Sequence, residues 1–174
     1  LKTKGVPMNR VAVFGKPGSG KSTLSKNLSK HAGIKLYALD SIEFQEDGTR
    51  VDSETFSIRH RELLAEENWL IDGMGTVTSF KERLAAADTW IYIDLPYWVS
   101  YWLVTKRLLK GLFVHPEGWP DGSSVLKGSI QSYKILKLCP KFWNQDFLNS
   151  LKKDSKEKNL YIIRSVKELN QFVA

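Results

Sequence analysis

The sequence predicts an α/β fold in which helices cover both faces of a five-stranded parallel sheet, making three layers. Two observations support this prediction. Five short apolar runs alternate along the chain with stretches that show helical spacing or helix-capping residues. A glycine-rich segment joins the first apolar run to the first helical stretch, as where a strand turns tightly into a helix. The 174 residues suit one domain, 1–174, without linker, internal repeat or low-complexity tract.

The first strand is predicted at residues 10–14, an apolar run of the kind found in buried strands. The first helix is predicted at 22–32, where Leu24 and Leu28 lie four residues apart among polar residues, and Gly33 ends it. The segment between strand and helix fits the phosphate-loop pattern G-x-x-x-x-G-K-[ST]. Its residues are Gly15, Lys16, Pro17, Gly18, Ser19, Gly20, Lys21, Ser22 and Thr23.

Each residue type in this loop has a chemical reason. Gly18 and Gly20 lack a Cβ, so the backbone can curl and aim its N–H groups at phosphate oxygens. The following helix presents its unpaired N–H groups and positive dipole end to the same anion. Lys21 brings a positive charge to the β- and γ-phosphates, and the Ser22 hydroxyl can ligate Mg²⁺. The loop therefore predicts binding of a nucleoside triphosphate, with ATP and Mg²⁺ as cofactors.

The middle of the chain continues the alternation. Residues 34–39 are predicted to form the second strand, which ends at Asp40. A helix capped near residue 52 runs to about residue 68, and the third strand, 69–71, ends at Asp72. Three further elements are a short helix at 80–87, a strand at 90–93 that ends at Asp94, and a helix at 97–110.

The last third is predicted to be mainly helical. Residues 112–123 are rich in Gly and Pro and are expected to form a lid-like surface segment. Two helices, 125–138 and 143–153, are expected to be separated by a break at Pro140. The final strand is predicted at 160–163, followed by a closing helix at 165–173 that starts with a Ser165–Glu168 capping box. The six tryptophans are expected mainly in the core and at helix contacts, with Trp119 of the lid segment also able to stack on a base.

Three aspartates follow predicted strands. Asp40, Asp72 and Asp94 each stand at the carboxyl end of one, where open parallel sheets bind their ligands. A single aspartate at such a place is as often a cap or turn residue. The three together, with Gly73, predict a substrate-binding edge next to the phosphate loop.

The charge of the chain is unevenly distributed. Residues 1–100 hold 13 Lys+Arg and 13 Asp+Glu, whereas residues 101–174 hold 13 and 6, so the second part carries the whole net charge of +7. A basic surface beside a phosphate loop indicates polyanionic ligands, and a nucleotide is sufficient to explain it. Nucleic acid stays open as a partner but is not favoured, because no recognised nucleic-acid-binding motif occurs.

The single cysteine, Cys139, excludes an internal disulfide framework and suits a reducing cytoplasm. No apolar run reaches the length of a membrane span, and the first residues do not have the pattern of a signal peptide. We therefore expect a cytoplasmic protein without a membrane partner. The oligomeric state is left open.

The loop resembles that of adenylate kinases and related small-molecule kinases, which share the form G-x-P-G-S-G-K. Four further segments look like the bacterial proteins known as DNA topology modulation proteins, which are themselves adenylate-kinase-like. The likeness extends over almost the whole chain, and the four segments read Leu39-Asp40, Asn68-Trp69-Leu70-Ile71-Asp72-Gly73, Arg83-Leu84-Ala85-Ala86-Ala87-Asp88-Thr89 and Ile93-Asp94-Leu95-Pro96.

The resemblance implies a P-loop fold with strand order 2-3-1-4-5 and ATP as phosphoryl donor. It implies that Asp40 lies where relatives bind the acceptor or a magnesium-bound water. Arg83 and Arg107 would be catalytic arginines that clamp phosphate, and Arg164 would lie near the adenine. The chain departs from relatives at Phe44, at Met74 after Asp72-Gly73, and in a lid without arginines.

These observations predict a phosphotransferase that moves the γ-phosphate of ATP to an unidentified small acceptor. A nucleoside monophosphate is one candidate acceptor. Lys21, Asp40, Arg83 and Arg107 are its expected catalytic residues. Two alternatives remain: a nucleotide-dependent regulator of DNA topology, and an ATP sensor that transfers nothing. A phosphate-loop hydrolase is ranked last, because no strand ends in the Asp-Glu pair of motor ATPases.

Overall fold

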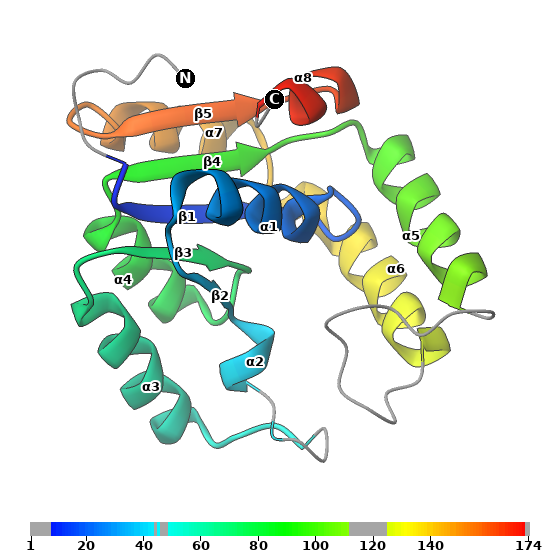
Figure 1. Cartoon of the computed structure of the whole chain (residues 1–174). Helices are drawn as coiled ribbons and strands as arrows, with labels where there is room; N and C mark the ends of the chain where they lie inside the picture. Colours follow the sequence, from blue (N-terminus) through cyan, green and yellow to red (C-terminus); the bar gives the residue numbers. More distant parts are fainter. Residues whose placement is uncertain (1–7, 44, 46–48, 112–124, 173–174) are drawn as a thin grey trace.

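The computed structural model describes residues 8–43, 45, 49–111 and 125–172. Its centre is a five-stranded, fully parallel sheet in the order β2-β3-β1-β4-β5 (Figure 1). The α/β fold class and the strand order are confirmed. The strands are β1 (Arg10–Gly15), β2 (Leu36–Ala38), β3 (Trp69–Asp72), β4 (Thr89–Ile93) and β5 (Asn159–Ile163).

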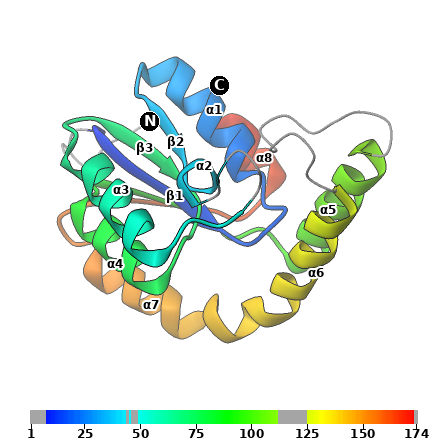
Figure 2. The ribbon, with the colours of Figure 1, turned by 90° about the horizontal axis from the view of Figure 1, so that it is seen from below.

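Helices cover both faces of the sheet. One face carries α1 and α8, and the other carries α3, α4 and α7, so the molecule has the three expected layers (Figure 2). The helices are α1 (Lys21–Ala32), α2 (Asp40–Glu43), α3 (Ser53–Ala65), α4 (Val77–Ala86), α5 (Tyr97–Gly111), α6 (Val125–Phe142), α7 (Gln145–Asp154) and α8 (Val166–Gln171).

Alternating residues of β1 belong to two separate cores. Val11 and Val13 pack with Leu24 and Leu28 of α1, because successive side chains of a strand point to opposite faces. Phe14 points the other way and stacks on Tyr92, with ring centroids 5.5 Å apart. All of β1 after Arg10 is buried, so the phosphate loop leaves from the most enclosed strand of the sheet.

One expectation about the helices is wrong. Pro140 does not break the helix: α6 runs through it to Phe142, and the break comes at Asn144, whose side chain accepts the Phe147 N–H. Pro140 sits in the last turn of α6, where its missing N–H costs one helical bond only.

The described tryptophans lie mainly in the core, as expected. Trp69, Trp90 and Trp143 are buried, whereas Trp98 and Trp102 are 73% and 56% exposed.

Candidate functional site

The phosphate loop turns at two glycines whose left-handed backbone conformation other residues rarely adopt. Gly18 and Gly20 have φ of +67° and +82°. A Cβ on Gly18 would lie 2.5 Å from the Ser100 carbonyl oxygen, and one on Gly20 would lie 2.8 Å from Leu169. The backbone of the loop therefore packs directly against α5 at Gly18 and against α8 at Gly20, without room for a side chain.

The start of α1 fits an anion. Gly20 is its N-cap, no side chain caps it, and its first turn contains no acid. By contrast, α3, α4 and α7 are each capped by a side chain, that of Asp52, Thr76 or Asn144. The Ser19 hydroxyl is buried and has no hydrogen-bond partner among the described residues. N–H groups that no side chain caps, at the positive end of a helix dipole, form a site for phosphate oxygens.

Lys21 lies in the middle of the charged groups of the site. Its Nζ donates a hydrogen bond to the Lys16 carbonyl oxygen at 2.9 Å, within the same loop. Desolvation lowers the pKa of Lys21, while the negative charges of Asp72 and Asp40 oppose the shift. An ammonium group that is desolvated beside two carboxylates is well placed to engage a third anion.

Asp72 and Ser22 together offer oxygen ligands for a cation. Asp72 is the last residue of β3, directly beside Val13 of β1, and its carboxyl group is hydrogen bonded by the Ser22 side chain. Burial raises the pKa of Asp72, while Lys21 and the Ser22 hydrogen bond counteract the rise. The sequence predicts a substrate role for Asp72 and a metal role for Ser22 alone. Mg²⁺ is commonly held by one or two protein oxygens and takes its other ligands from water and phosphate, so Ser22 and Asp72 together fit it.

Asp40 and Arg107 approach the loop from two further elements. Asp40 is the exposed first residue of α2, and its charge acts on both Lys21 and Arg107. Arg107 lies on α5, where its Nη2 donates to the Ser132 hydroxyl of α6 at 2.8 Å. Desolvation lowers the pKa of Arg107, and Tyr133 and Asp40 oppose this. The structure thus brings Lys21, Asp40, Asp72 and Arg107 to one edge of the sheet.

Arg83 has a different environment from the one the resemblance implies. It is fully buried, and its Nη2 donates to the carbonyl oxygens of Gly73 and Met74 at 2.8 and 3.0 Å. Burial lowers its pKa to about 10, opposed by the charge of Asp72. These contacts connect Arg83 to the turn that follows Asp72. A phosphate clamp by Arg83 stays a prediction.

Lys16 and Asp94 bind each other. The Lys16 Nζ lies 2.6 Å from Asp94 Oδ1 and 4.7 Å from the centre of the Tyr97 ring, and the Lys16 side chain is 1% exposed. The Tyr92 hydroxyl also donates to Asp94 Oδ1, at 3.2 Å. Sequence reasoning placed Lys16 with the nucleotide and Asp94 with the substrate. No sequence signal reveals their pairing, because the two residues are 78 positions apart.

The structure gives positions for the other predicted site residues, and their roles stay predictions. Pro17 and Thr23 lie in the loop and the first turn of α1. Arg164 follows β5, and its backbone N–H donates to Glu168, which completes the capping box with Ser165. Proximity of Arg164 to an adenine stays a prediction. The lid segment 112–123, with Trp119, lies outside the described residues.

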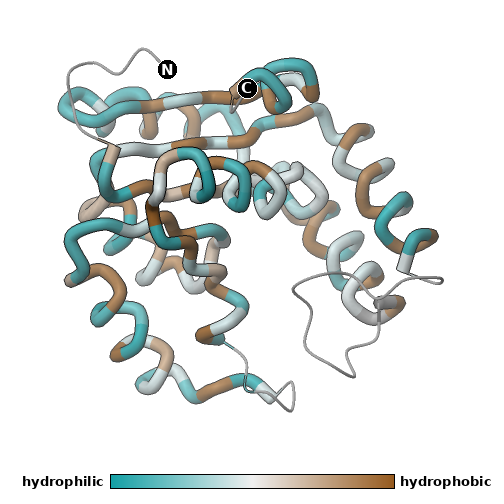
Figure 3. The backbone as a smooth tube through the Cα atoms, viewed as in Figure 1, coloured by the Kyte–Doolittle hydropathy of each residue, from teal (hydrophilic) through white to brown (hydrophobic). Residues whose placement is uncertain are grey.

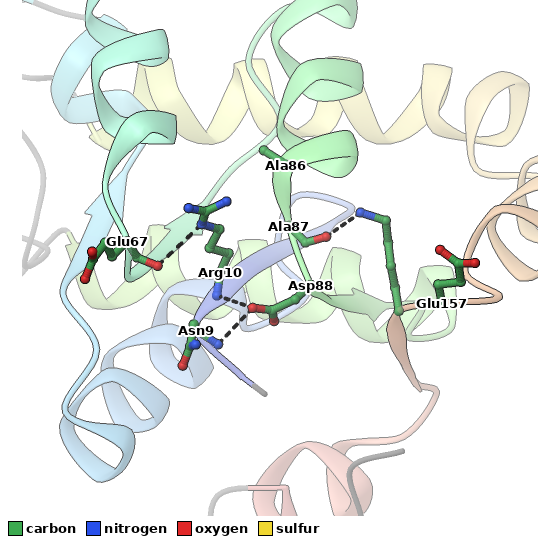
Figure 4. Close-up of a pocket in the computed structure, with 8 residues that line it drawn as sticks. Asn9, Arg10, Glu67, Ala86, Ala87, Asp88 and Glu157 are labelled. Atoms are coloured by element: carbon green, nitrogen blue, oxygen red, sulfur yellow. Dashed lines mark hydrogen bonds between the residues drawn. The ribbon is translucent and has the colours of Figure 1, made fainter. Parts of the chain in front are cut away.

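A cleft of about 380 Å³ lies at the opposite, amino-terminal edge of the sheet (Figure 4). Its polar groups bind one another. Asp88 accepts the N–H groups of Asn9 and Arg10, and Lys158 donates to the carbonyl oxygens of Ala85 and Ala87 at the end of α4. These contacts anchor the start of β1 to the end of α4. The cleft is therefore structural, and the carboxyl edge holds the candidate site.

Comparisons with known proteins show the fold. No family model matches the chain, and no curated protein does. An unliganded sugar kinase from Janibacter sp. HTCC2649 matches with a TM-score of 0.51 and 15% identity, over 96% of this chain and 91% of that one. A gluconokinase from Sinorhizobium meliloti 1021 matches with a TM-score of 0.51 and 14% identity, over 95% and 87%. Likeness at such low identity shows a shared fold alone, so the reaction must be argued from the chemistry of the site.

Within the described residues, no helix is both long and apolar enough to cross a membrane.

Proposed function

We propose that the chain is a small-molecule kinase that transfers the γ-phosphate of ATP to a hydroxyl or phosphate oxygen of a small acceptor. One observation carries the proposal. The uncapped start of α1, Lys21 and the Ser22–Asp72 pair meet at one edge of the sheet, and the separate carboxylate of Asp40 acts on the same lysine. Phosphoryl transfer needs positioned charge around the phosphate and a group that orients the nucleophile.

Each group has a distinct role in this proposal. The amides of residues 18–22 and the Lys21 ammonium bind the β- and γ-phosphates. Ser22 and Asp72 hold Mg²⁺, which when bound neutralises charge on the transferring group. Asp40 accepts a hydrogen bond from the acceptor hydroxyl and so orients its oxygen toward the phosphorus. Arg107 stabilises the charge that develops on the phosphoryl oxygens.

The acceptor has two candidate classes. The likeness to adenylate kinases favours a nucleoside monophosphate. The two structural neighbours are a sugar kinase and a gluconokinase, which favours a sugar or a hydroxy acid. Both classes supply the hydroxyl or phosphate oxygen that such a site can use. The two classes differ in whether the acceptor itself carries a phosphate group that the site must bind.

A coupled assay of ADP release tests the proposal. Purified protein is supplied with ATP, Mg²⁺ and a panel of nucleoside monophosphates, sugars and hydroxy acids. We expect one class to stimulate ADP release, Lys21→Ala to lower the rate about a hundredfold or more, and Asp40→Asn to lower it while ATP still binds. Lys30→Ala, on an exposed position of the same helix, is the matched control and should have no effect.

Two outcomes contradict the proposal in different ways. ATP binding without acceptor-dependent ADP release over the whole panel indicates a nucleotide sensor. If ATP does not bind even at millimolar concentration, the proposed nucleotide site is itself wrong. A regulator that acts on DNA would instead show duplex affinity that falls steeply with salt.

A further inference from the structure

The pair of helices α5 and α6 projects from one side of the molecule (Figure 1), and apolar residues recur along both (Figure 3). Several of these residues are exposed, and on α5 they are Trp98, Trp102 and Leu109, which are 73%, 56% and 56% exposed. At about 100° per residue they fall within an arc of about 40°, so they form one stripe. The opposite side of α5 contains Ser100 and Val104, which are buried.

A second exposed stripe follows α6. Leu126, Ile130, Leu138 and Phe142 are 55%, 45%, 50% and 57% exposed. They occur at steps of four residues, and Lys134 takes the one remaining position of the series. Residues four apart are neighbours on a helix surface, so these side chains form a row, which Lys134 interrupts and which turns by about 160° around the helix from Leu126 to Phe142. Exposed apolar surface of this extent on two adjacent helices marks an interaction site.

The contacts between the two helices do not use these stripes. Tyr101 stacks on Tyr133 with ring centroids 6.0 Å apart, and Thr105 and Tyr133 share a hydrogen bond of 2.7 Å. Arg107 and Ser132 make a further bond between α5 and α6. Other residues therefore hold the pair together, and within the described part of the chain neither core cluster contains a residue of the two stripes.

The charge on the same two helices is of one sign. There are three Lys or Arg in α5 and four in α6, and neither helix contains Asp or Glu. One of these, Arg107, donates to Ser132 and belongs to the candidate site, which leaves two basic residues in α5 and four in α6. The Lys106 ammonium lies 5.1 Å from the centre of the Trp102 ring, so cation and aromatic surface are adjacent. Any partner must accept apolar side chains and supply negative charge.

We propose that the α5–α6 pair lies on the surface of a lipid bilayer with anionic headgroups. Tryptophan and aliphatic side chains enter the boundary between headgroups and acyl chains, and the flanking lysines meet the phosphates. A second copy of the chain fits poorly, because two acid-free cationic surfaces repel each other. Nucleic acid would accept the lysines and the tryptophans but gives no apolar environment to Leu126, Ile130 and Leu138. The site is separate from the phosphate loop and does not depend on the kinase proposal.

Binding of the full chain to vesicles tests this inference. The vesicles are mixed phosphatidylglycerol and phosphatidylcholine, or phosphatidylcholine alone, and flotation measures binding at low and at physiological salt. We expect binding to the anionic vesicles only, with a blue shift of tryptophan emission. Trp98→Ser with Trp102→Ser, and separately Lys106→Glu with Lys110→Glu, should each weaken it about tenfold or more. Lys152→Glu with Lys153→Glu, the same charge change on exposed positions of α7, should change it less than threefold, roughly what long-range screening allows.

Circular dichroism and urea unfolding establish that each variant folds. Folding is expected, because all substituted positions are exposed. Three results would overturn the inference: no binding to anionic vesicles at low salt, binding that the tryptophan pair does not change, or equal loss in both lysine pairs. The same variants are titrated with duplex DNA. The surface is assigned to nucleic acid instead if the parent binds duplex DNA but not vesicles, and if the variant with Lys106→Glu and Lys110→Glu loses the binding to duplex.

Discussion

The guanidinium of Arg83 is enclosed by the protein and is bound by backbone carbonyls rather than by a carboxylate. Its hydrogen bonds go to Gly73 and Met74, and its charge lowers the pKa of Asp72 against the effect of burial. We infer that Arg83 positions the end of β3 and helps keep Asp72 ionised. It acts on a bound cation only through Asp72.

This role predicts the behaviour of Arg83→Met. Two part-buried carbonyl oxygens lose their charged donor, so unfolding in urea should show a loss of about 2 kcal/mol. Asp72 should also protonate more easily, which raises the Mg²⁺ concentration needed for half-maximal ATP binding. Arg61→Met is the control, because Arg61 is 66% exposed and makes a surface ion pair with Glu82, which is worth less than about 1 kcal/mol. Equal loss in both variants would contradict the positioning role.

The ion pair of Lys16 and Asp94 predicts a measurable coupling. Lys16→Met leaves the Asp94 carboxylate without its cation in a site where it is 30% exposed, so we expect a loss of about 2 kcal/mol rather than the larger cost of a fully buried pair. Lys16→Met combined with Asp94→Asn should lose less than the sum of the single variants. Urea unfolding of all four proteins measures the coupling, and additive losses would show that the pair contributes nothing.

At the level of elements, the phosphate loop and α5 are in contact through Gly18. Gly18 and Gly33 have the same φ, +67°, but a Cβ on Gly33 would meet nothing within 4 Å. Gly33→Ala should therefore cost only the left-handed conformation, about 1 kcal/mol. Gly18→Ala adds a clash with the Ser100 carbonyl oxygen and with Val104, so it should cost more and should weaken ATP binding about tenfold or more. Calorimetry with ATP and Mg²⁺ compares the two, and equal affinities would contradict this contact.

The interface of α3 and α4 contains a buried histidine. His60 is enclosed, stacks on Phe56, and has Glu82, Arg83 and Arg61 as its charged neighbours. Desolvation and the Arg83 charge lower its pKa to about 4, while Glu82 opposes the shift. The folded protein therefore resists a proton that the unfolded chain accepts below about pH 6.5.

The sign of the pH effect follows from this. The contribution of neutral His60 to stability is complete above about pH 6.5 and is lost as the pH falls toward 4. The difference amounts to about 3 kcal/mol at most. His60→Leu should lack this component, so its free energy of unfolding should fall less steeply between pH 6.5 and 4 than that of the parent. Parallel curves for the two proteins over this range would show that His60 does not cause the dependence.

For the whole molecule, the sequence was most informative where pattern and local chemistry agree. The apolar runs at 10–14 and 90–93 match β1 and β4 within one residue, because strands buried on both faces show as continuous apolar segments. The strand order followed from the resemblance to P-loop kinases. The Ser165–Glu168 box was also recognised, since a cap depends only on neighbouring residues.

Other features depend on residues distant in sequence. The pairing of Lys16 with Asp94, the enclosure of Arg83 and the contact of Asp72 with Ser22 all arise from how strands lie side by side. Trp98 and Trp102 have the spacing of a core-facing stripe, and only the packing of α5 shows that this stripe faces outward. Pattern identifies an apolar face but not what covers it.

The central position of β1 has a consequence for synthesis on the ribosome. β1 is the first strand to be made, yet its two neighbours are β3 and β4, and Gly15 is level with Ile93. At about 5–20 residues per second, the glycine turn emerges several seconds before the strand that supports it. While β4 is still unmade, the glycine turn and Lys21 therefore lack the strand that supports them. Under the proposed function, ATP begins to stabilise the nascent chain only once β4 has left the exit tunnel.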